Sequence, residues 1–294
     1  MAFARIAVLA AAAIAFAGAG SPDPELELRV LTFNIRYGTA ADGEDRWELR
    51  RERLYGVLER CDADVVGLQE ALRFQLDEIR AALPEYGEVG AGRDDGKEAG
   101  EYSAILYKKD RLRVDEEGTF WFSDTPDEPG SRSWGNQIPR ICTWARFVEK
   151  ETGRAFYVFN VHLDHASQPS RERSAEALLR AIARRKNPDP AIVTGDFNAG
   201  EDNPAVLAIA RGAGPPGGGA LADTYRAVRP GDRDAGTFHG FSGRASGPKI
   251  DYIFVSPLIE TLDAEIIRDH EGGRYPSDHF PVFARIRIPR APRG

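Results

Sequence analysis

The apolar residues of this chain occur in short runs of strand length and in longer segments where they recur every three or four positions. Short apolar runs bounded by turn residues predict buried strands, whereas the three-and-four spacing predicts amphipathic helices. Strands are expected at residues 28–34, 64–69, 104–108, 114–122, 140–149, 155–163, 191–195, 249–255, 262–268 and 280–288. Helices are expected at residues 47–60, 72–83, 170–185 and 203–211. This strand-rich pattern with interspersed helices is compatible with an α/β fold but does not identify one.

The remaining segments follow neither period and predict loops or irregular structure. They are the flexible acidic loop 90–100, the long loop 123–137, the Gly/Pro linker 212–219, and the irregular segments 221–230 and 237–247. Phe238, His239 and Phe241 are expected at the surface, and His239 and His270 are interpreted as surface or loop histidines. No internal repeat and no shift in composition requires a domain boundary, which predicts one domain over residues 21–294.

The first residues have the pattern of a secretory signal. Arg5 precedes the apolar run Ile6–Ala17, and small residues follow it. This order predicts a signal peptide over residues 1–20 and a secreted or periplasmic protein. The less favoured alternative is an uncleaved N-terminal membrane anchor, because the apolar run is shorter than the roughly 20 residues that an ordinary membrane span needs.

Composition limits the classes of function. The chain has 39 Lys and Arg against 46 Asp and Glu, a formal charge of −7, and 42% hydrophobic residues. The apolar content is sufficient for a large core, and the acidic balance disfavours a protein that holds long nucleic acid by neutralising its phosphates. Cys61 and Cys142 are the only cysteines. They are interpreted as small core residues rather than as a disulfide or a catalytic thiol.

Polar residues suited to catalysis follow nearly every expected strand. They are Asn34, Glu70, Glu101, His162, Asp196, Asn198, Asp251, Asp278 and His279. Asp196 and Asn198 are two residues apart, so a continuing strand would place both on one side, where they could hold a water molecule. The simpler alternative is that both residues only cap backbone groups in a turn. Carboxylate and amide oxygens favour Mg²⁺, with Mn²⁺ possible, over a closed zinc site.

Six short motifs occur along the chain in a fixed order, and together they are far more specific than any one of them alone. They are Leu31-Thr32-Phe33-Asn34, Gly67-Leu68-Gln69-Glu70, Asn160-Val161-His162-Leu163-Asp164, Gly195-Asp196-Phe197-Asn198, Lys249-Ile250-Asp251-Tyr252-Ile253 and Ser277-Asp278-His279. From about Leu28 to Arg287 the chain resembles the endonuclease/exonuclease/phosphatase superfamily of metal-dependent phosphoesterases. The resemblance implies a four-layer α/β sandwich, with two mixed β-sheets packed face to face and helices outside.

The resemblance also implies a role for each motif residue. Glu70 would be the main metal carboxylate, with Asn34 and Asp278 beside it. Asp196 would orient or deprotonate the attacking water, and Asn198 would hold that water or a phosphoryl oxygen.

Two histidines complete the implied site. His279 would contact the phosphoryl group, with Asp251 fixing its tautomer and supporting its charge. His162, paired with Glu101, would be a second phosphate contact or an acid toward the leaving oxygen.

Two further residues are candidates for substrate binding. Arg140 is the candidate for bidentate contact with the phosphate, because a guanidinium matches phosphate geometry. Asp164, like His165, belongs either to the rim of the site or to structural hydrogen bonding.

These observations predict a secreted, Mg²⁺-dependent phosphoesterase that hydrolyses a phosphomonoester or phosphodiester by metal-assisted, in-line attack of water. The expected substrate is a phosphorylated small molecule, a lipid head group or a single-stranded nucleic acid. A monomer without a stable protein partner is expected. The alternatives are a secreted nuclease acting on DNA or RNA, and a non-catalytic binding protein on the same scaffold.

Overall fold

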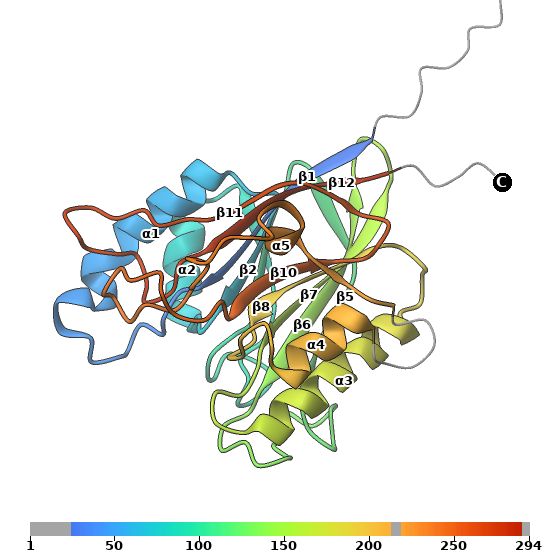
Figure 1. The fold of residues 1–294 in the computed structure, drawn as a ribbon, viewed down its shortest axis with the longest axis horizontal. Coiled ribbons are helices and arrows are strands. Elements are labelled where there is room, and N and C mark those ends of the chain that lie inside the picture. Colours follow the sequence, from blue (N-terminus) through green and yellow to red (C-terminus); the bar gives the residue numbers. More distant parts are fainter. Residues whose placement is uncertain (1–24, 213–218, 290–294) are drawn as a thin grey trace, which may run out of the picture.

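The computed structural model describes residues 25–212 and 219–289, which form two six-stranded mixed β-sheets and a few helices (Figure 1). The expected signal peptide at residues 1–20 and most of the expected linker lie outside the described residues. Among the described residues, no helix is long and apolar enough to cross a membrane.

The first sheet contains both ends of the described chain, because β1 pairs with β12. Its strand order is β11-β12-β1-β2-β4-β3. The bounds are β1 (Leu26–Asn34), β2 (Val65–Gln69), β3 (Tyr86–Val89), β4 (Ile105–Lys108), β11 (Glu260–Ile266) and β12 (Val282–Ile288).

The second sheet is built mainly from the middle of the chain, in the order β5-β6-β7-β8-β10-β9. Its strands are β5 (Leu112–Trp121), β6 (Ile141–Glu149), β7 (Ala155–His162), β8 (Ala191–Asp196), β9 (Ala222–Asp223) and β10 (Asp251–Val255). In each sheet the central pair, β1 with β2 and β7 with β8, is parallel.

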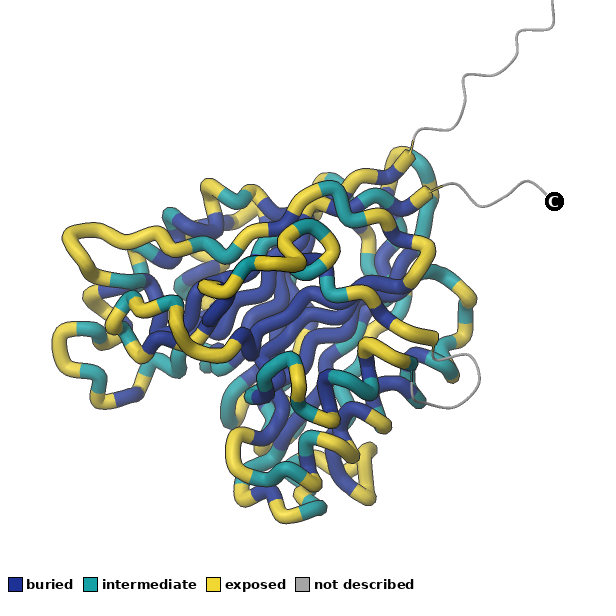
Figure 2. Tube along the Cα trace, viewed as in Figure 1, coloured by how far each residue is buried: buried dark blue, intermediate teal, exposed yellow. Residues whose placement is uncertain are grey.

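Three apolar clusters hold four layers together. The buried residues concentrate in the middle of the molecule (Figure 2). One cluster contains residues of both sheets and therefore lies between them. The second joins the first sheet to α1 (Trp47–Cys61) and α2 (Arg73–Ala82). The third joins the second sheet to α3 (Gln168–Arg184) and α4 (Pro204–Arg211). This is the four-layer α/β sandwich expected from the resemblance.

The face between the sheets changes from apolar to polar along each central strand. In β1, Leu28 and Val30 belong to the cluster between the sheets, and Thr32 and Asn34 continue on the same face. In β8, Ile192 belongs to that cluster, and Thr194 and Asp196 follow it on the same face. Because these polar ends lie in neighbouring layers, the functional residues meet at one edge of the sandwich.

Three local expectations were wrong. β3 was not predicted, because it has only four residues between a proline and a glycine. β9 and α5 (Thr224–Val228) form in the segment expected to be irregular. In the acidic loop, the amides of Gly92, Arg93 and Asp94 donate to later carbonyls, so this loop forms compact turns. Cys61 and Cys142 are both free; Cys142 is a buried core residue as expected, whereas Cys61 is only partly buried.

Candidate active site

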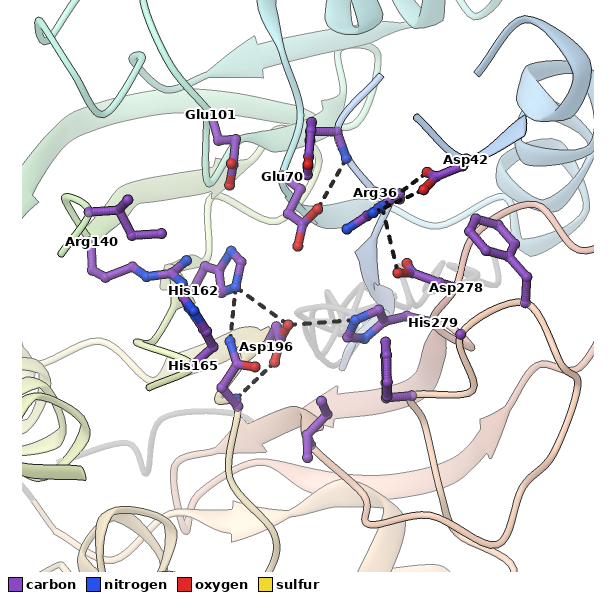
Figure 3. Close-up of a pocket in the computed structure, with 17 residues that line it drawn as sticks. Arg36, Asp42, Glu70, Glu101, Arg140, His162, His165, Asp196, Asp278 and His279 are labelled. Carbon is purple, nitrogen blue, oxygen red and sulfur yellow. Dashed lines mark hydrogen bonds and ion pairs between the residues drawn. The ribbon is translucent and has the colours of Figure 1, made fainter. Parts of the chain in front are cut away.

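A pocket of about 700 Å³ opens at the polar ends of the central strands (Figure 3). Its walls are formed by Arg36, Tyr37, Asp42, Glu70, Glu101, Ile138, Arg140, His162, His165, Asp196, Asn198, Phe238, Gly240, Phe241, Ile250, Asp278 and His279. Most of the predicted site residues therefore line one space. Asn34, Asp251 and Asp164 do not line it, but each contacts a residue that does.

Asn34 joins the two sheets behind the pocket. Its Nδ2 donates to Oε1 of Glu70 at 3.1 Å and to Oδ2 of Asp196 at 3.0 Å. Its Oδ1 accepts the Arg36 amide at 3.0 Å. In this arrangement Asn34 orients two carboxylates, and its predicted role as a metal ligand stays a prediction.

The carboxylates of Glu70 and Asp278 form the anionic side of the pocket. Glu70 follows β2 in a left-handed conformation with φ of 61°, and its Oε2 accepts the Tyr37 amide at 3.1 Å. Asp278 Oδ1 accepts the Ser277 hydroxyl at 3.2 Å. Burial raises the pKa of Asp278, although the neighbouring charge of His279 opposes that rise. The oxygen-only donors at this side suit a hard divalent cation.

A tight turn carries Asp196 and Asn198 into the pocket. The Asn198 amide donates to Oδ1 of Asp196 at 2.8 Å, and Asn198 is left-handed with φ of 47°. The strand ends at Asp196, so this turn, and not continued strand alternation, brings both side chains to the pocket. The turn-capping role and the pocket-lining role therefore coexist. Burial, reinforced by the charge of Asp251, raises the pKa of Asp196 to about 7.

His279 lies between two carboxylates. Its Nδ1 is 2.9 Å from Oδ2 of Asp251, and its Nε2 is 3.8 Å from Oδ2 of Asp196. Burial alone would lower the pKa of His279, but the carboxylates of Asp251 and Asp196 outweigh it and raise the pKa well above the usual value. One atom from each of these three residues lies within 4.8 Å of the others, which is also compatible with a cation. Because each ring nitrogen already faces a carboxylate, a charged imidazolium fits this geometry better.

The predicted pair of His162 with Glu101 is not formed. Glu101 instead accepts two hydrogen bonds from the Arg93 guanidinium, at 2.6 and 2.7 Å. His162 Nε2 lies 3.0 Å from Nδ2 of Asn198 and 3.5 Å from Oδ2 of Asp196. Burial, together with the charge of Arg140, lowers the pKa of His162 well below its usual value. His162 is therefore the neutral histidine of the site.

Arg140 lines the pocket with its guanidinium largely buried. It is only 3% exposed, its Nη2 lies 2.9 Å from Nδ1 of His165, and its Nε lies 3.4 Å from Asp164. Its Nη1 is buried without a partner among the described residues. Asp164 accepts the amides of Ala166 and Ser167, which favours its structural alternative. Arg140 thus carries one nitrogen that makes no hydrogen bond with the described residues, and its guanidinium suits an anionic ligand.

The sequence did not indicate several pocket residues. Arg36, Tyr37 and Asp42 follow β1 in a loop without periodicity. His239 was expected at the surface, but it is only 6% exposed because its ring stacks on Phe280 at a centroid distance of 3.9 Å. Phe238 is 46% exposed and lines the pocket, so its predicted exposure is confirmed. For Arg36, the only feature of the sequence that could have indicated a place in the site is that it follows Asn34 by two positions.

A buried polar cluster lies directly beneath the site, between the sheets. Asn160 Oδ1 accepts the Gln69 side-chain amide at 2.7 Å and the Thr194 hydroxyl at 3.0 Å. Asn160 Nδ2 donates to the carbonyls of Leu68 and Ala104, each at 2.8 Å. Each of the three polar side chains lies one or two positions before a pocket residue.

Comparisons with known proteins agree with this geometry. The family model described as the endonuclease/exonuclease/phosphatase family matches residues 31–279. A solved endonuclease/exonuclease/phosphatase structure from Bacteroides vulgatus has 36% sequence identity and a TM-score of 0.82, covering 90% of this chain and 100% of that chain. The mannosyl-6-phosphatase of Bacteroides thetaiotaomicron has 36% identity and a TM-score of 0.78, covering 88% and 99%.

One sequence relative comes from a virus. An uncharacterised protein of Acanthamoeba polyphaga mimivirus is 31% identical over 180 residues, which cover 58% of this chain and 66% of the viral protein. The chain therefore spans just under two thirds of that relative's length.

Proposed function

The chain belongs to the endonuclease/exonuclease/phosphatase family, and we propose that it is a Mg²⁺-dependent phosphomonoesterase that acts on a phosphorylated sugar. Members of this family are divalent-metal-dependent hydrolases of phosphoester bonds. One observation carries the proposal: Glu70, Asp278, Asp196, His279 and Arg140 line one pocket, with Asp278 and His279 side by side and Arg140 on the opposite wall (Figure 3).

Glu70 and Asp278 are the residues that would hold the cation, with Asn34 aligning Glu70. Both carboxylates line the pocket, and Asp196 adds a third carboxylate nearby. A phosphate dianion would be repelled from this wall unless a cation compensated the charge. When bound, Mg²⁺ supplies Lewis-acid stabilisation of the negative charge on the phosphoryl oxygens.

Asp196 is placed to orient the attacking water and to accept its proton. Its pKa of about 7 is close to neutrality, which suits a general base. Asn34 and the Asn198 amide fix its two oxygens, so the carboxylate has one orientation. Attack of the water oxygen on phosphorus breaks the bond to the leaving oxygen and releases inorganic phosphate.

His279 and Arg140 would stabilise the phosphoryl group. The raised pKa of His279 keeps the ring charged, so it can donate from Nε2 to a phosphoryl oxygen. Arg140 contributes its free Nη1. Because the pKa of His162 is lowered, we do not assign protonation of the leaving oxygen to His162; the leaving oxygen takes its proton from solvent water in the open pocket. His162 positions Asn198 through their 3.0 Å contact.

The choice of a sugar phosphate rests on two supports. The solved mannosyl-6-phosphatase is 36% identical to this chain. The formal charge of −7 opposes the binding of long nucleic acid. Secretion rests on residues 1–20 of the sequence alone, and we retain it as part of the proposal.

A phosphoester panel tests this function. Mannose 6-phosphate, glucose 6-phosphate, bis(p-nitrophenyl) phosphate, plasmid DNA and RNA are each incubated with Mg²⁺ or with EDTA. We expect release of inorganic phosphate from the hexose phosphates, abolished by EDTA and by Asp196→Asn. Salt-sensitive degradation of DNA or RNA would instead support a secreted nuclease. Full hydrolysis in the presence of EDTA, or by the Asp196→Asn variant, would overturn the mechanism. If the wild type with Mg²⁺ hydrolyses none of these substrates, the binding-protein alternative is favoured.

A further inference from the structure

The proposed phosphoryl chemistry assigns no role to one part of the pocket wall. It consists of Arg36, Asp42, Phe238 and Phe241, which we call the rim. Arg36 Nε lies 3.8 Å from Oδ2 of Asp278, and the Phe238 ring lies 5.1 Å from the His279 ring. The rim is therefore next to the site of bond cleavage, on its Asp278–His279 side (Figure 3).

Phe238 is held as a fixed platform. The amides of His239 and Gly240 donate to the Asp278 carbonyl at 2.9 and 3.1 Å, and the Phe280 amide donates to the Thr237 carbonyl at 2.7 Å. These bonds fasten the loop to the segment that carries His279. Phe238 nevertheless remains 46% exposed, and it packs edge-on against the histidine ring. A large apolar ring held beside a catalytic group gives a substrate a surface to cover.

Arg36 and Asp42 provide the polar half of the rim. Their side chains form two hydrogen bonds, with Nε to Oδ2 at 3.0 Å and Nη2 to Oδ1 at 2.9 Å. The side chains are 28% and 14% exposed, so the pair faces the pocket without being solvated on all sides. An arginine–carboxylate pair offers donors and acceptors side by side, which is the arrangement that two neighbouring hydroxyl groups would need. Arg50 fixes the backbone of the pair by donating to the Arg36 carbonyl at 2.7 Å.

Backbone conformation sets the rim apart independently. Among the described residues, six non-glycine residues have a positive φ. Four of the six line the pocket: Arg36, Glu70, Asn198 and Phe241. Such conformations cost free energy and cluster at functional sites. The left-handed conformations of Glu70 and Asn198 fit their proposed roles in binding the metal and the water. The proposed phosphoryl transfer gives no reason for the left-handed conformations of Arg36 (φ 56°) and Phe241 (φ 62°).

We infer that the rim binds the sugar ring of the leaving group, with Phe238 covering a C–H face and the Arg36–Asp42 pair bonding adjacent hydroxyls. This inference rests on the proposed function, because it concerns the alcohol that the reaction releases. An aromatic surface beside a planar polar pair is complementary to a pyranose, which has an apolar face and a polar edge. The pocket of about 700 Å³ has room for a monosaccharide in addition to the phosphate.

Binding of a sugar without phosphate tests the inference independently of catalysis. Saturation-transfer NMR is recorded with methyl α-mannopyranoside on the wild type, Phe238→Ala and Asp42→Asn. Adenosine is included as a second ligand, to test whether the rim prefers a nucleoside to a sugar. Leu258→Ala is the matched control, because Leu258 is 66% exposed and does not line the pocket. We expect transfer to the ring C–H protons in the wild type and in the control, and its loss in the two rim variants.

Kinetics provides the second measurement. The ratio of kcat/KM for mannose 6-phosphate to kcat/KM for glycerol 3-phosphate, which lacks a ring, is compared among the same variants. Loss of an aromatic contact predicts that Phe238→Ala lowers this ratio on the order of 10-fold. An equal loss for both substrates, or stronger transfer to adenosine than to the mannoside, would overturn the sugar site. Failure to bind the mannoside with phosphoester hydrolysis intact refutes only this inference, whereas mannoside binding without any hydrolysis refutes the proposed function.

Discussion

The side-chain amide of Asn34, at the end of β1 in one sheet, donates to the carboxylate of Asp196, at the end of β8 in the other, at 3.0 Å. In the proposed mechanism, this bond connects the side of the pocket that would hold the metal to the residue that would orient the water. The same nitrogen donates to Glu70, so one amide sets the spacing between two carboxylates. The relative placement of the two sheets is therefore part of the proposed catalytic geometry.

Replacing Asn34 should lower both the catalytic rate and the stability of the protein. Asn34→Leu removes both bonds and leaves Asp196 without one of its two hydrogen bonds in a buried site. We expect kcat to fall by about 100-fold, on the scale of losses for residues that orient a catalytic group, and the free energy of unfolding to fall by about 1–3 kcal/mol. Steady-state kinetics and urea denaturation measure the two effects. A variant with wild-type kcat would contradict the link.

The buried hydroxyl of Thr194 predicts a second effect on alignment. Thr194→Val keeps the shape but removes the 3.0 Å bond to Asn160, which leaves part of the polar cluster unsatisfied. We expect a fall in kcat of about 10-fold, with Mn²⁺ binding by titration calorimetry unchanged, because the metal side is not altered. Thr194→Ser retains the hydroxyl and should restore kcat. Equal kinetics for the valine and serine variants would assign Thr194 a role in stability alone.

The sequence was sufficient to predict the strand-end residues, because one face of each central strand has a simple pattern. In β1, Leu28 and Val30 are apolar and Asn34 ends the run, and period-two alternation places all three on one face. The close approach of the sheets is also visible at Gly67, where an added Cβ would lie 2.2 Å from the Thr194 hydroxyl. The strand pattern alone thus predicted that Asn34 and Asp196 lie at strand ends on the face between the sheets.

The partners of these residues could not be predicted in the same way. Glu101 binds Arg93, eight positions earlier, because compact turns fold the acidic loop back on itself. His239 is buried by the ring of Phe280, which belongs to a segment about 40 residues away, and no periodicity in either loop indicates that contact. Contacts between loops depend on backbone turns that only the tertiary structure fixes.

The β6–β7 hairpin should be less stable in acid because of Glu149. Its Oε2 accepts the Thr152 amide at 2.7 Å and hydroxyl at 2.6 Å. Burial alone would raise the pKa of Glu149, but these bonds outweigh it and lower the pKa. A lowered folded-state pKa contributes stability above the unfolded pKa, and this contribution is lost as pH falls through the folded value.

Glu149→Gln should therefore destabilise the protein by about 1 kcal/mol at pH 7. The difference between the variant and the wild type should shrink below the unfolded pKa of about 4.3. Urea denaturation at a series of pH values measures this difference. A difference that is constant from pH 7 to pH 3 would show that the carboxylate charge has no part in the turn.

Arg50 ties together the two loops that frame the metal side of the pocket. Its Nη1 donates to the carbonyls of Ile35 and Pro276, at 2.7 and 2.9 Å, although the side chain is only 1% exposed. Arg50→Met leaves buried carbonyls without donors, so we expect a loss of about 3–5 kcal/mol in stability and weaker Mg²⁺ activation. Arg51→Met is the control, with an expected change within about 0.5 kcal/mol. Equal effects for the two variants in denaturation would contradict this role.

Binding of Mg²⁺ should be visible as a change in stability as well as in activity. Glu70 and Asp278 lie close to Asp196, and their mutual repulsion is relieved when a cation binds. Because the native state alone presents this arrangement, Mg²⁺ at about 100 times its Kd should stabilise the protein by about 2.7 kcal/mol and raise its Tm. EDTA should remove both the Tm shift and hydrolysis.

Substitution of Glu70 distinguishes a specific site from general screening of the acidic surface. Glu70→Gln keeps the size of the side chain but removes one ligand charge, so the Tm shift with Mg²⁺ should be largely lost. Glu172→Gln, in α3 and outside the pocket, should keep it, because Glu172 accepts a solvent-exposed hydrogen bond from Gln168 and does not line the pocket. Thermal denaturation across a range of Mg²⁺ concentrations measures both variants. If the two variants lose the shift equally, the cation acts through the net charge of −7, and the metal site at Glu70 is refuted.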